Sequence, residues 1–291
     1  MNGSIPVLHV EADGLAAAWE DSVLTLWENG CDIRTEYDAK NPDGTWAHPP
    51  SKDCTMMMTV RNPSSEPLIH RAFPGGLEDL EEYRQEVVDG IKDHWVRDGQ
   101  DHDGTKWEYT YHGRLTRYAG HGRDDDQLQG MVDKLSVSPI SRRVQAITWQ
   151  PWQDNDCIDP PCLQSIWCRI LPDENDIWHL NMNVRFRSRD AYDAAFMNCF
   201  AFICLQEDLA RRIAEKAGRE VRLGHYCDMS DSYHIYGRRL EHFRTGFFKQ
   251  VFDRSWEDRT WTREDAEEIF ALARPTIAEK VSQQDEKEKR K

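Results

Sequence analysis

The sequence lacks any apolar run long enough to span a bilayer, and its first residues, MNGSIPVLHVEADG, lack the basic and apolar regions of a signal peptide. Basic residues are also scarce, because 37 Lys and Arg stand against 52 Asp and Glu and give a formal net charge of −15. This balance opposes non-specific binding to nucleic acid or to an anionic membrane surface. We therefore expect a cytoplasmic protein with no nucleic-acid or membrane partner, in which an anionic ligand needs a local basic pocket.

Several motifs that carry known chemistry are absent as well. The sequence contains neither a GxGxxG nor a GxxxxGK[ST] phosphate loop, and no GxSxG turn. Its eight cysteines are scattered rather than densely spaced, so we expect reduced thiols. The residues that could compete as metal ligands are Cys157, Cys162, Cys168, His225, Cys227 and His234. Their cysteine spacings of x4 and x5, with no second pair, fit structural zinc sites poorly, so no metal is expected.

Hydrophobic periodicity predicts a mixture of helices and strands. Helices are expected over 15–27, 76–95, 126–135 and 191–217, and a last helix from Thr262, with a capping-box-like Asp265, to Pro275. Strands are expected over 54–60, whose three consecutive Met residues we assign to the core, and over 165–171, 180–186 and 221–236. No repeat or linker divides the chain, which predicts one domain over 1–281 followed by a disordered charged tail over 282–291.

One cysteine stands in a setting suited to a nucleophile. Cys162 follows Asp159-Pro160-Pro161, and the two prolines stiffen the chain just before a predicted strand. The thiolate is the reactive form of cysteine, so catalysis requires a cation such as an arginine nearby. The alternative is a buried structural cysteine, since free cysteines are among the most buried residues.

Two arginine clusters could bind a phosphate group. Ser141-Arg142-Arg143 and Arg187-Ser188-Arg189-Asp190 each combine guanidinium groups with a hydroxyl, which suits bidentate recognition of phosphate. Each cluster alone is weak evidence, because adjacent arginines are usually solvated surface charge.

The order of these motifs resembles that of thymidylate synthases. The segments, over about 76–237, are DQLQGMVDKLSVSPISRRVQAITWQP, DPPCLQ, RFRSRDAYDAAFMNCFAF and DSYHIYG. The resemblance implies an α/β fold with a large mixed β-sheet flanked by helices, and a homodimer packed through its sheets with shared active sites. It also implies a pyrimidine nucleoside 5′-monophosphate as substrate and 5,10-methylenetetrahydrofolate as cofactor.

The same resemblance implies roles for the catalytic residues. Cys162 would add to C6 of the pyrimidine, and Arg187 would favour its thiolate while contacting the 5′-phosphate. Glu86, within EVVDG, would be the general acid-base, and Tyr109 would lie near C5. Asp190 would bind the folate pterin.

Further residues would recognise the nucleotide. Ser188 would bind the phosphate, joined by Arg142 and Arg143 from the partner subunit, and Arg34 would stand in for an N-terminal phosphate-binding arginine. Asn198 would read the edge of the base. The ribose hydroxyl would be held by His234 and Tyr236.

The sequence also departs from the common thymidylate synthase pattern. Leu163 replaces the histidine that usually follows the catalytic cysteine, and Ser232-Tyr233 precedes His234 where Gly-Asp-(Ala/Thr) is usual. The chain ends in charged residues rather than in the apolar residue that closes over the folate, so water could reach the intermediate. Together with the block FRSRDAYDAAFMN, which looks closer to antibiotic-pathway CMP hydroxymethylases and to archaeal-type relatives, this predicts hydroxymethylation of CMP.

The sequence is compatible with several alternatives. Phage-type dCMP hydroxymethylases have Asp where this chain has Asn198, and a neutral amide suits uracil, although the amide can rotate to present a donor or an acceptor. Methylation of dUMP to dTMP and hydroxymethylation of dCMP or dUMP are therefore alternatives. The non-enzymatic alternative is a catalytically silent relative that only binds nucleotide.

Overall fold

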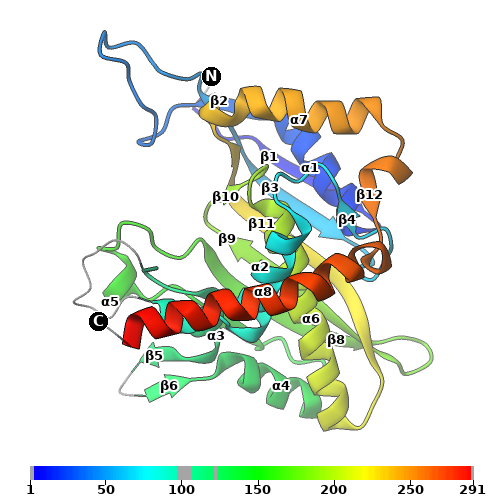
Figure 1. The fold of residues 1–291 in the computed structure, drawn as a ribbon. Coiled ribbons are helices and arrows are strands. Elements are labelled where there is room, and N and C mark those ends of the chain that lie inside the picture. Colours follow the sequence, from blue (N-terminus) through cyan, green and yellow to red (C-terminus); the bar gives the residue numbers. More distant parts are fainter. Residues whose placement is uncertain (1–2, 97–105, 121–122, 290–291) are drawn as a thin grey trace.

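A computed structural model of the chain describes residues 3–96, 106–120 and 123–289 (Figure 1). Its main sheet has eight strands, with β1-β3-β11-β9-β8-β7 as the central order, β2 added to β3 and β10 added to β11. These strands are β1 (Val7–Ala12), β2 (Cys31–Ile33), β3 (Ser51–Val60), β7 (Gln145–Ile147), β8 (Leu163–Pro172), β9 (Trp178–Phe186), β10 (Arg189–Asp190) and β11 (Val221–Ile235). The sheet is mixed, because β1 is parallel to β3 and β9 to β11, whereas β3 and β11 are antiparallel.

The helices and the short strands complete the molecule. The helices are α1 (Leu15–Asn29), α2 (Leu77–Asp89), α3 (Tyr111–Thr116), α4 (Gln127–Val137), α5 (Pro151–Asp154), α6 (Ala195–Ala217), α7 (Leu240–Asp253) and α8 (Arg263–Lys289). The remaining short strands are β4 (Ile69–His70) with β12 (Thr260–Trp261), and β5 (Tyr118–Gly120) with β6 (Arg123–Asp125). The expected α/β architecture with a large mixed sheet flanked by helices is thus present.

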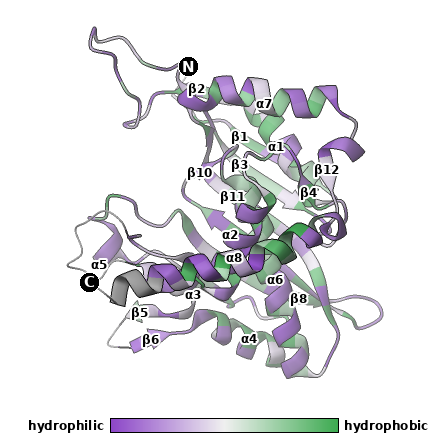
Figure 2. Cartoon of the chain, in the orientation of Figure 1, coloured by the Kyte–Doolittle hydropathy of each residue, from purple (hydrophilic) through white to green (hydrophobic). Residues whose placement is uncertain are grey.

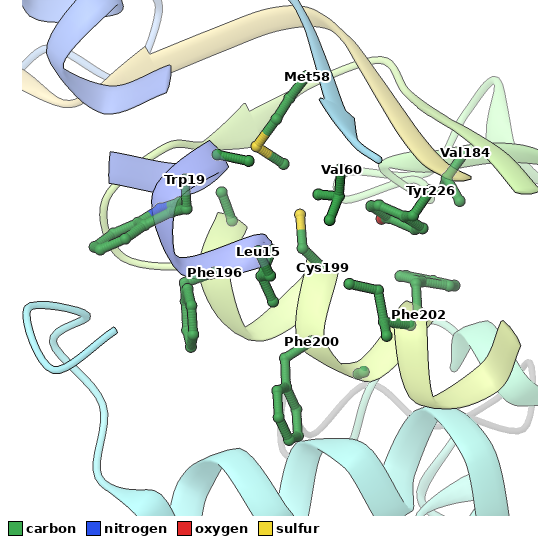
Figure 3. Close-up of a cluster of buried hydrophobic side chains, with 14 of the residues drawn as sticks. Leu15, Trp19, Met58, Val60, Val184, Phe196, Cys199, Phe200, Phe202 and Tyr226 are labelled. Carbon is green, nitrogen blue, oxygen red and sulfur yellow. The ribbon is translucent and has the colours of Figure 1, made fainter. Parts of the chain in front are cut away.

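The core lies between the sheet and the helices α1 and α6. Trp19 of α1 packs edge-on against Phe196 of α6 and donates its indole N–H to the Ala191 carbonyl at 2.9 Å (Figure 3). From the sheet, Met58 and Val60 of β3 point into the same cluster. The alternating pleat of β3 turns the next side chain away, so Met57 is 38% exposed on the opposite face. The prediction that all three consecutive Met residues are core is therefore wrong for Met57.

Helix ends differ from the sequence prediction where the backbone is constrained. α2 ends at Asp89 rather than near 95, because Gly90 adopts a left-handed φ of 66° that terminates the helix. α8 begins with the expected mutual hydrogen bonds of Thr262 and Asp265, but it continues through Pro275 to Lys289. Pro275 is exposed, so water can solvate the carbonyl that its missing N–H leaves without a donor.

The end of α8 covers most of the segment that we expected to be a disordered tail. That segment, SQQDEKEKRK, is rich in Glu, Lys and Gln, which favour helix, and this accounts for the difference. Hydrophilic and hydrophobic residues alternate along α8, as expected for a helix that packs on α2 on one side and faces water on the other (Figure 2).

A buried ion pair links β10 to β11 beneath the arginine cluster of residues 187–190. Arg189 donates to Asp228 at 2.7 Å and lies over the Phe186 ring, and the Tyr226 hydroxyl donates to the same carboxylate at 2.8 Å. Arg189 is only 3% exposed. The position of Arg189 in the sequence suggested an outward-facing phosphate-binding cluster. Its side chain instead points into the protein interior, where it pairs with Asp228.

This pair predicts a large difference between two substitutions on β11. Asp228→Asn leaves a buried guanidinium without its counter-ion and is expected to lower the free energy of unfolding by about 3 kcal/mol. Asp231→Asn, three residues along, breaks an exposed pair with Arg185 and should cost less than about 1 kcal/mol. Urea unfolding followed by circular dichroism measures both, and similar losses for the two variants would contradict the assignment.

Candidate active site

Cys162 and Arg187 are brought together by two neighbouring strands. Cys162 directly precedes β8 and Arg187 directly follows β9, which is antiparallel to β8. The Arg187 backbone N–H donates to the Cys162 carbonyl at 2.8 Å. The Arg187 guanidinium donates to the carbonyls of Pro161 at 3.1 Å and Pro160 at 2.5 Å. The two prolines thus hold the guanidinium beside the thiol.

The electrostatic environment of the thiol reflects opposing effects. Burial raises the pKa of Cys162 above its usual value, Arg187 lowers it, Asp159 raises it, and Arg189 lowers it more weakly. The net direction is upward, so the thiol is mostly protonated at neutral pH. The two arginines are the groups that favour the thiolate.

A hollow of about 480 Å³ opens next to Asp159, three residues before Cys162. Its aromatic lining is Tyr83, Trp107, Tyr109 and Tyr111, and its charged lining is Glu86, Lys106, Glu108 and Asp159. Burial raises the pKa of Tyr109, and proximity to Cys162 raises it further. Tyr109 and Glu86 therefore line the same hollow, and Tyr109 lies close to the predicted nucleophile Cys162.

Glu86 lies on α2, 13% exposed, with its carboxylate 3.5 Å from the Lys92 ammonium. Burial raises the pKa of Glu86 to about 7, while Lys92 lowers it. A carboxyl group with this pKa exchanges protons readily near neutral pH, which is the property required of a general acid-base.

Tyr83 is a site residue that the sequence reading missed. Its hydroxyl accepts a hydrogen bond from the Asn198 amide at 2.6 Å, and it lines the hollow beside Glu86. The amide of Asn198, the predicted base-reading residue, is therefore held by Tyr83. Tyr83 stands three residues before Glu86 on α2, so helical spacing around Glu86 would have pointed to it.

His234, Tyr236 and Asp190 meet at the end of β11. Asp190 of β10 is opposite His234 in the strand register, and the rings of His234 and Tyr236 are 4.6 Å apart. Burial raises the pKa of Asp190 to about 6 and lowers that of His234 to about 4. Burial raises the pKa of Tyr236, with a smaller upward effect from Asp190.

The remaining predicted residues lie at the margins. Arg34 donates to the His48 carbonyl at 2.8 Å and stacks on Trp46, in the loop between β2 and β3. Ser188 lies partly buried between Arg187 and β10. Arg142 and Arg143 are exposed before β7, and within the described residues their guanidinium groups have no hydrogen bond or ion pair. The antiparallel register places Gln145 opposite Trp167, so within one subunit these two arginines lie along β8 away from Cys162.

Within residues 3–96, 106–120 and 123–289, no group of three or more His, Cys, Asp or Glu side chains is arranged to hold a metal ion. None of the helices in that part of the chain is long and apolar enough to cross a membrane.

Comparisons with known proteins agree with the motif order. A family model described as "Thymidylate synthase" matches residues 71–264, well over half of the chain. A "Putative thymidylate synthase" from Methanocaldococcus jannaschii is 24% identical over 255 residues, covering 86% of this chain and 100% of the relative. One from Methanosarcina mazei with the same description is 27% identical over 227 residues, covering 78% and 88%. Among solved structures, thermostable thymidylate synthase A from Bacillus subtilis gives a TM-score of 0.55 at 21% identity, over 80% of this chain and 83% of that chain, which shows a shared fold.

The environment of Cys162 predicts its reactivity toward iodoacetamide. Because only the thiolate reacts and burial raises the thiol pKa, the alkylation rate of Cys162 should reach half its maximum above about pH 8.5, the value for an ordinary thiol. Arg187→Gln removes the cation that favours the thiolate and should move this midpoint about one pH unit higher. Peptide mass spectrometry distinguishes Cys162 from the other cysteines.

A matched control for that experiment lies near the end of β9. Arg185→Gln removes an exposed guanidinium paired with Asp231, two residues before Arg187, and should leave the midpoint unchanged. A midpoint that falls in the Arg187 variant, or moves equally in both variants, would show that Arg187 does not set the thiol pKa.

Proposed function

Because the chain belongs to the thymidylate synthase family, we propose that it transfers a one-carbon unit to C5 of a pyrimidine nucleoside 5′-monophosphate, most specifically converting CMP to 5-hydroxymethyl-CMP. The proposal is supported by the pairing of Arg187 with Cys162, and by a hollow that Tyr109 and Glu86 line and in which Tyr109 lies close to Cys162. We name CMP as the leading substrate because the segment FRSRDAYDAAFMN resembles CMP hydroxymethylases.

Cys162 acts as the nucleophile in this proposal. C5 of a pyrimidine is a poor nucleophile until a thiolate adds to C6, after which C5 carries the electron pair of an enamine or enolate. Arg187 favours the thiolate, and binding of the 5′-phosphate by Arg187 and Ser188 holds C6 against the sulfur. At the end of the reaction the C6–S bond breaks and the thiol is regenerated.

Glu86 moves the protons. After the C5–carbon bond forms, C5 must lose its proton, and Glu86 with a pKa of about 7 is suited to accept it. Once this proton has passed on to the departing amine, Glu86 is a carboxylate again and can deprotonate the water that adds to the exocyclic methylene. Tyr109 and Tyr83 lie on the wall of the same hollow, and Tyr83 holds the amide of Asn198 toward the base.

The residues present fit a reduced folate. Asp190 accepts the backbone N–H groups of Tyr192 and Asp193 through Oδ1, while Oδ2 has no hydrogen-bond partner within the described residues. That free oxygen suits the N–H donors of a pterin, and the aromatic wall of the hollow suits its ring. When bound, 5,10-methylenetetrahydrofolate supplies the one-carbon unit at the oxidation level of formaldehyde.

The polarity of the hollow favours water over hydride as the second reactant. Glu86, Lys106, Glu108 and Asp159 all line it, and charged walls retain water. Water adding to the exocyclic methylene gives a hydroxymethyl group and leaves tetrahydrofolate unoxidised. Hydride transfer would require the opposite, a site from which water is excluded.

The proposal includes a homodimer packed through the sheets. Met57 and Met229 face each other across β3 and β11 on the sheet face opposite α1 and α6, and both are over a third exposed. Two such faces packed together would bury these side chains. Arg142 and Arg143 are exposed without partners in the described part of the chain, so they are free to reach the phosphate site of a second subunit.

The reaction is tested by its products. The protein is incubated with 5,10-methylenetetrahydrofolate and each of CMP, dCMP, UMP and dUMP, and the nucleotides are analysed by mass spectrometry. We expect a product heavier by one CH₂O from CMP, no dihydrofolate, and complete loss of turnover in Cys162→Ala. A methylated product with dihydrofolate from dUMP would instead identify a thymidylate synthase, and the absence of any product or covalent adduct would identify a silent nucleotide-binding relative.

Shared sites are tested by mixing two inactive variants. One carries Cys162→Ala and the other Arg142→Ala with Arg143→Ala. A mixed dimer contains one site with both the cysteine and the arginines intact, so exchange of subunits should restore up to about a quarter of wild-type activity. If the mixture is no more active than the sum of its parts, each site lies within one subunit.

A further inference from the structure

Three polar side chains that the proposed mechanism does not fully use form a chain across β3 and β11. The Ser232 hydroxyl lies 2.8 Å from Asp53 Oδ2 and 3.1 Å from His234 Nδ1. Asp53 and His234 are opposite each other in the antiparallel register, so both side chains are on the same face of the sheet. Asp53 is 8% exposed and His234 is 7% exposed.

The protons of this chain can be assigned by counting donors. An ionised carboxylate only accepts, so the single Ser232 proton is donated to Asp53. The Ser232 oxygen must then accept a proton from His234 Nδ1–H. Neutral His234 therefore has its lone pair on Nε2, which makes this nitrogen an acceptor.

Two buried acceptor atoms of these side chains remain without a hydrogen-bond donor. Asp53 Oδ1 and His234 Nε2 are both inaccessible to solvent and have no hydrogen-bond partner within the described residues. Buried polar atoms are normally paired, and an unpaired one in a native structure calls for an explanation such as a ligand. Two acceptors on facing residues call for a ligand with two adjacent donors.

The position of the pair identifies the part of the nucleotide that it would meet. The Ser232 backbone N–H donates to the Arg187 carbonyl at 3.2 Å, and the Arg187 backbone N–H donates to the Cys162 carbonyl at 2.8 Å. A nucleotide with its base at Cys162 and its phosphate at Arg187 has its sugar between them, where the neighbouring hydroxyl groups are the only strong donors. A ribose offers two such groups, and a deoxyribose offers one.

We propose that Asp53 is a specificity-determining residue that accepts a hydrogen bond from the ribose 2′-hydroxyl while His234 accepts one from the 3′-hydroxyl, so that the site selects ribonucleotides over deoxyribonucleotides. The inference rests on the proposed function, because it takes Cys162 as the place of the base. A deoxyribose leaves the Asp53 carboxylate buried and unpaired. Sites built to bind a hydroxyl discriminate strongly against analogues that lack it, so a preference of about 100-fold or more is expected.

The first measurement is binding to the wild-type full chain by calorimetry, with matched pairs CMP and dCMP, and UMP and dUMP. In each pair the ribonucleotide should bind about 100-fold more tightly, whichever base is preferred. The 2′-fluoro-2′-deoxy nucleotide is the decisive probe, because fluorine fills the space of the hydroxyl but cannot donate. It should bind as weakly as the deoxynucleotide.

The second measurement uses variants on the two strands. Asp53→Asn should reduce the ribose preference to about tenfold or less, chiefly by weakening ribonucleotide binding, while Asp231→Asn on β11 should leave it unchanged. Circular dichroism and the thermal midpoint verify that Asp53→Asn is folded. The fluoro probe on the wild type tests the proposal even if that variant does not fold.

The outcomes separate this inference from the proposed function. Equal binding of ribo- and deoxynucleotides overturns the role of Asp53, as does a 2′-fluoro nucleotide that binds like the ribonucleotide or a preference that survives in Asp53→Asn. In each case a trapped water is the partner of Asp53, and one-carbon transfer can still occur. If ribose preference depends on Asp53 but no nucleotide is converted, the sugar assignment stands and the proposed reaction is wrong.

Discussion

The ion pair between Arg189 and Asp228 is the interaction on which the site depends. It joins β10 to β11 in the interior, with the guanidinium stacked on Phe186 and the carboxylate also bonded to Tyr226. Because Arg189 points inward, its neighbour Asp190 lies on the opposite face of the strand pair, beside His234. The buried cation also lowers the pKa of Cys162, so one structural pair positions the site and contributes to its potential.

Burial is the common cause of the unusual acidities around this pair. It raises the pKa of Glu86 to about 7 and those of Asp53 and Asp190 to about 6, and it lowers that of His234 to about 4. Each of the three carboxyl groups keeps a specific partner: Lys92, Ser232 and the Tyr192 amide respectively. An acidic chain thus builds a site whose carboxyl groups titrate close to neutral pH, where proton transfer is most useful.

Structural features that depend on neighbouring residues could be predicted from the sequence. Features that depend on contacts between residues far apart in the chain could not. Periodicity located α1, α6 and β9 to within a few residues, and motif order gave the fold. Tyr83 and Asn198 are 115 residues apart, and Asp53 and Ser232 are 179 apart, so no local pattern could connect them. The inward turn of Arg189 was missed for the same reason, since only the tertiary structure supplies Asp228 as its partner.

A single extra residue in β11 explains why His234 faces Asp53 at all. Ser230 is opposite Met56 of β3, whereas Tyr233 is opposite Cys54, so the register shifts by one residue between them. A regular ladder would have continued with His234 opposite Lys52 and on the helix-packed face, as Ser230 is. The bulge instead turns Tyr233 inward, where it bonds to Ser22 of α1, and moves His234 to the other face opposite Asp53. The sequence before His234 differs from the usual thymidylate synthase pattern at the position of this bulge. Ser232 lies within the bulge and bridges Asp53 to His234.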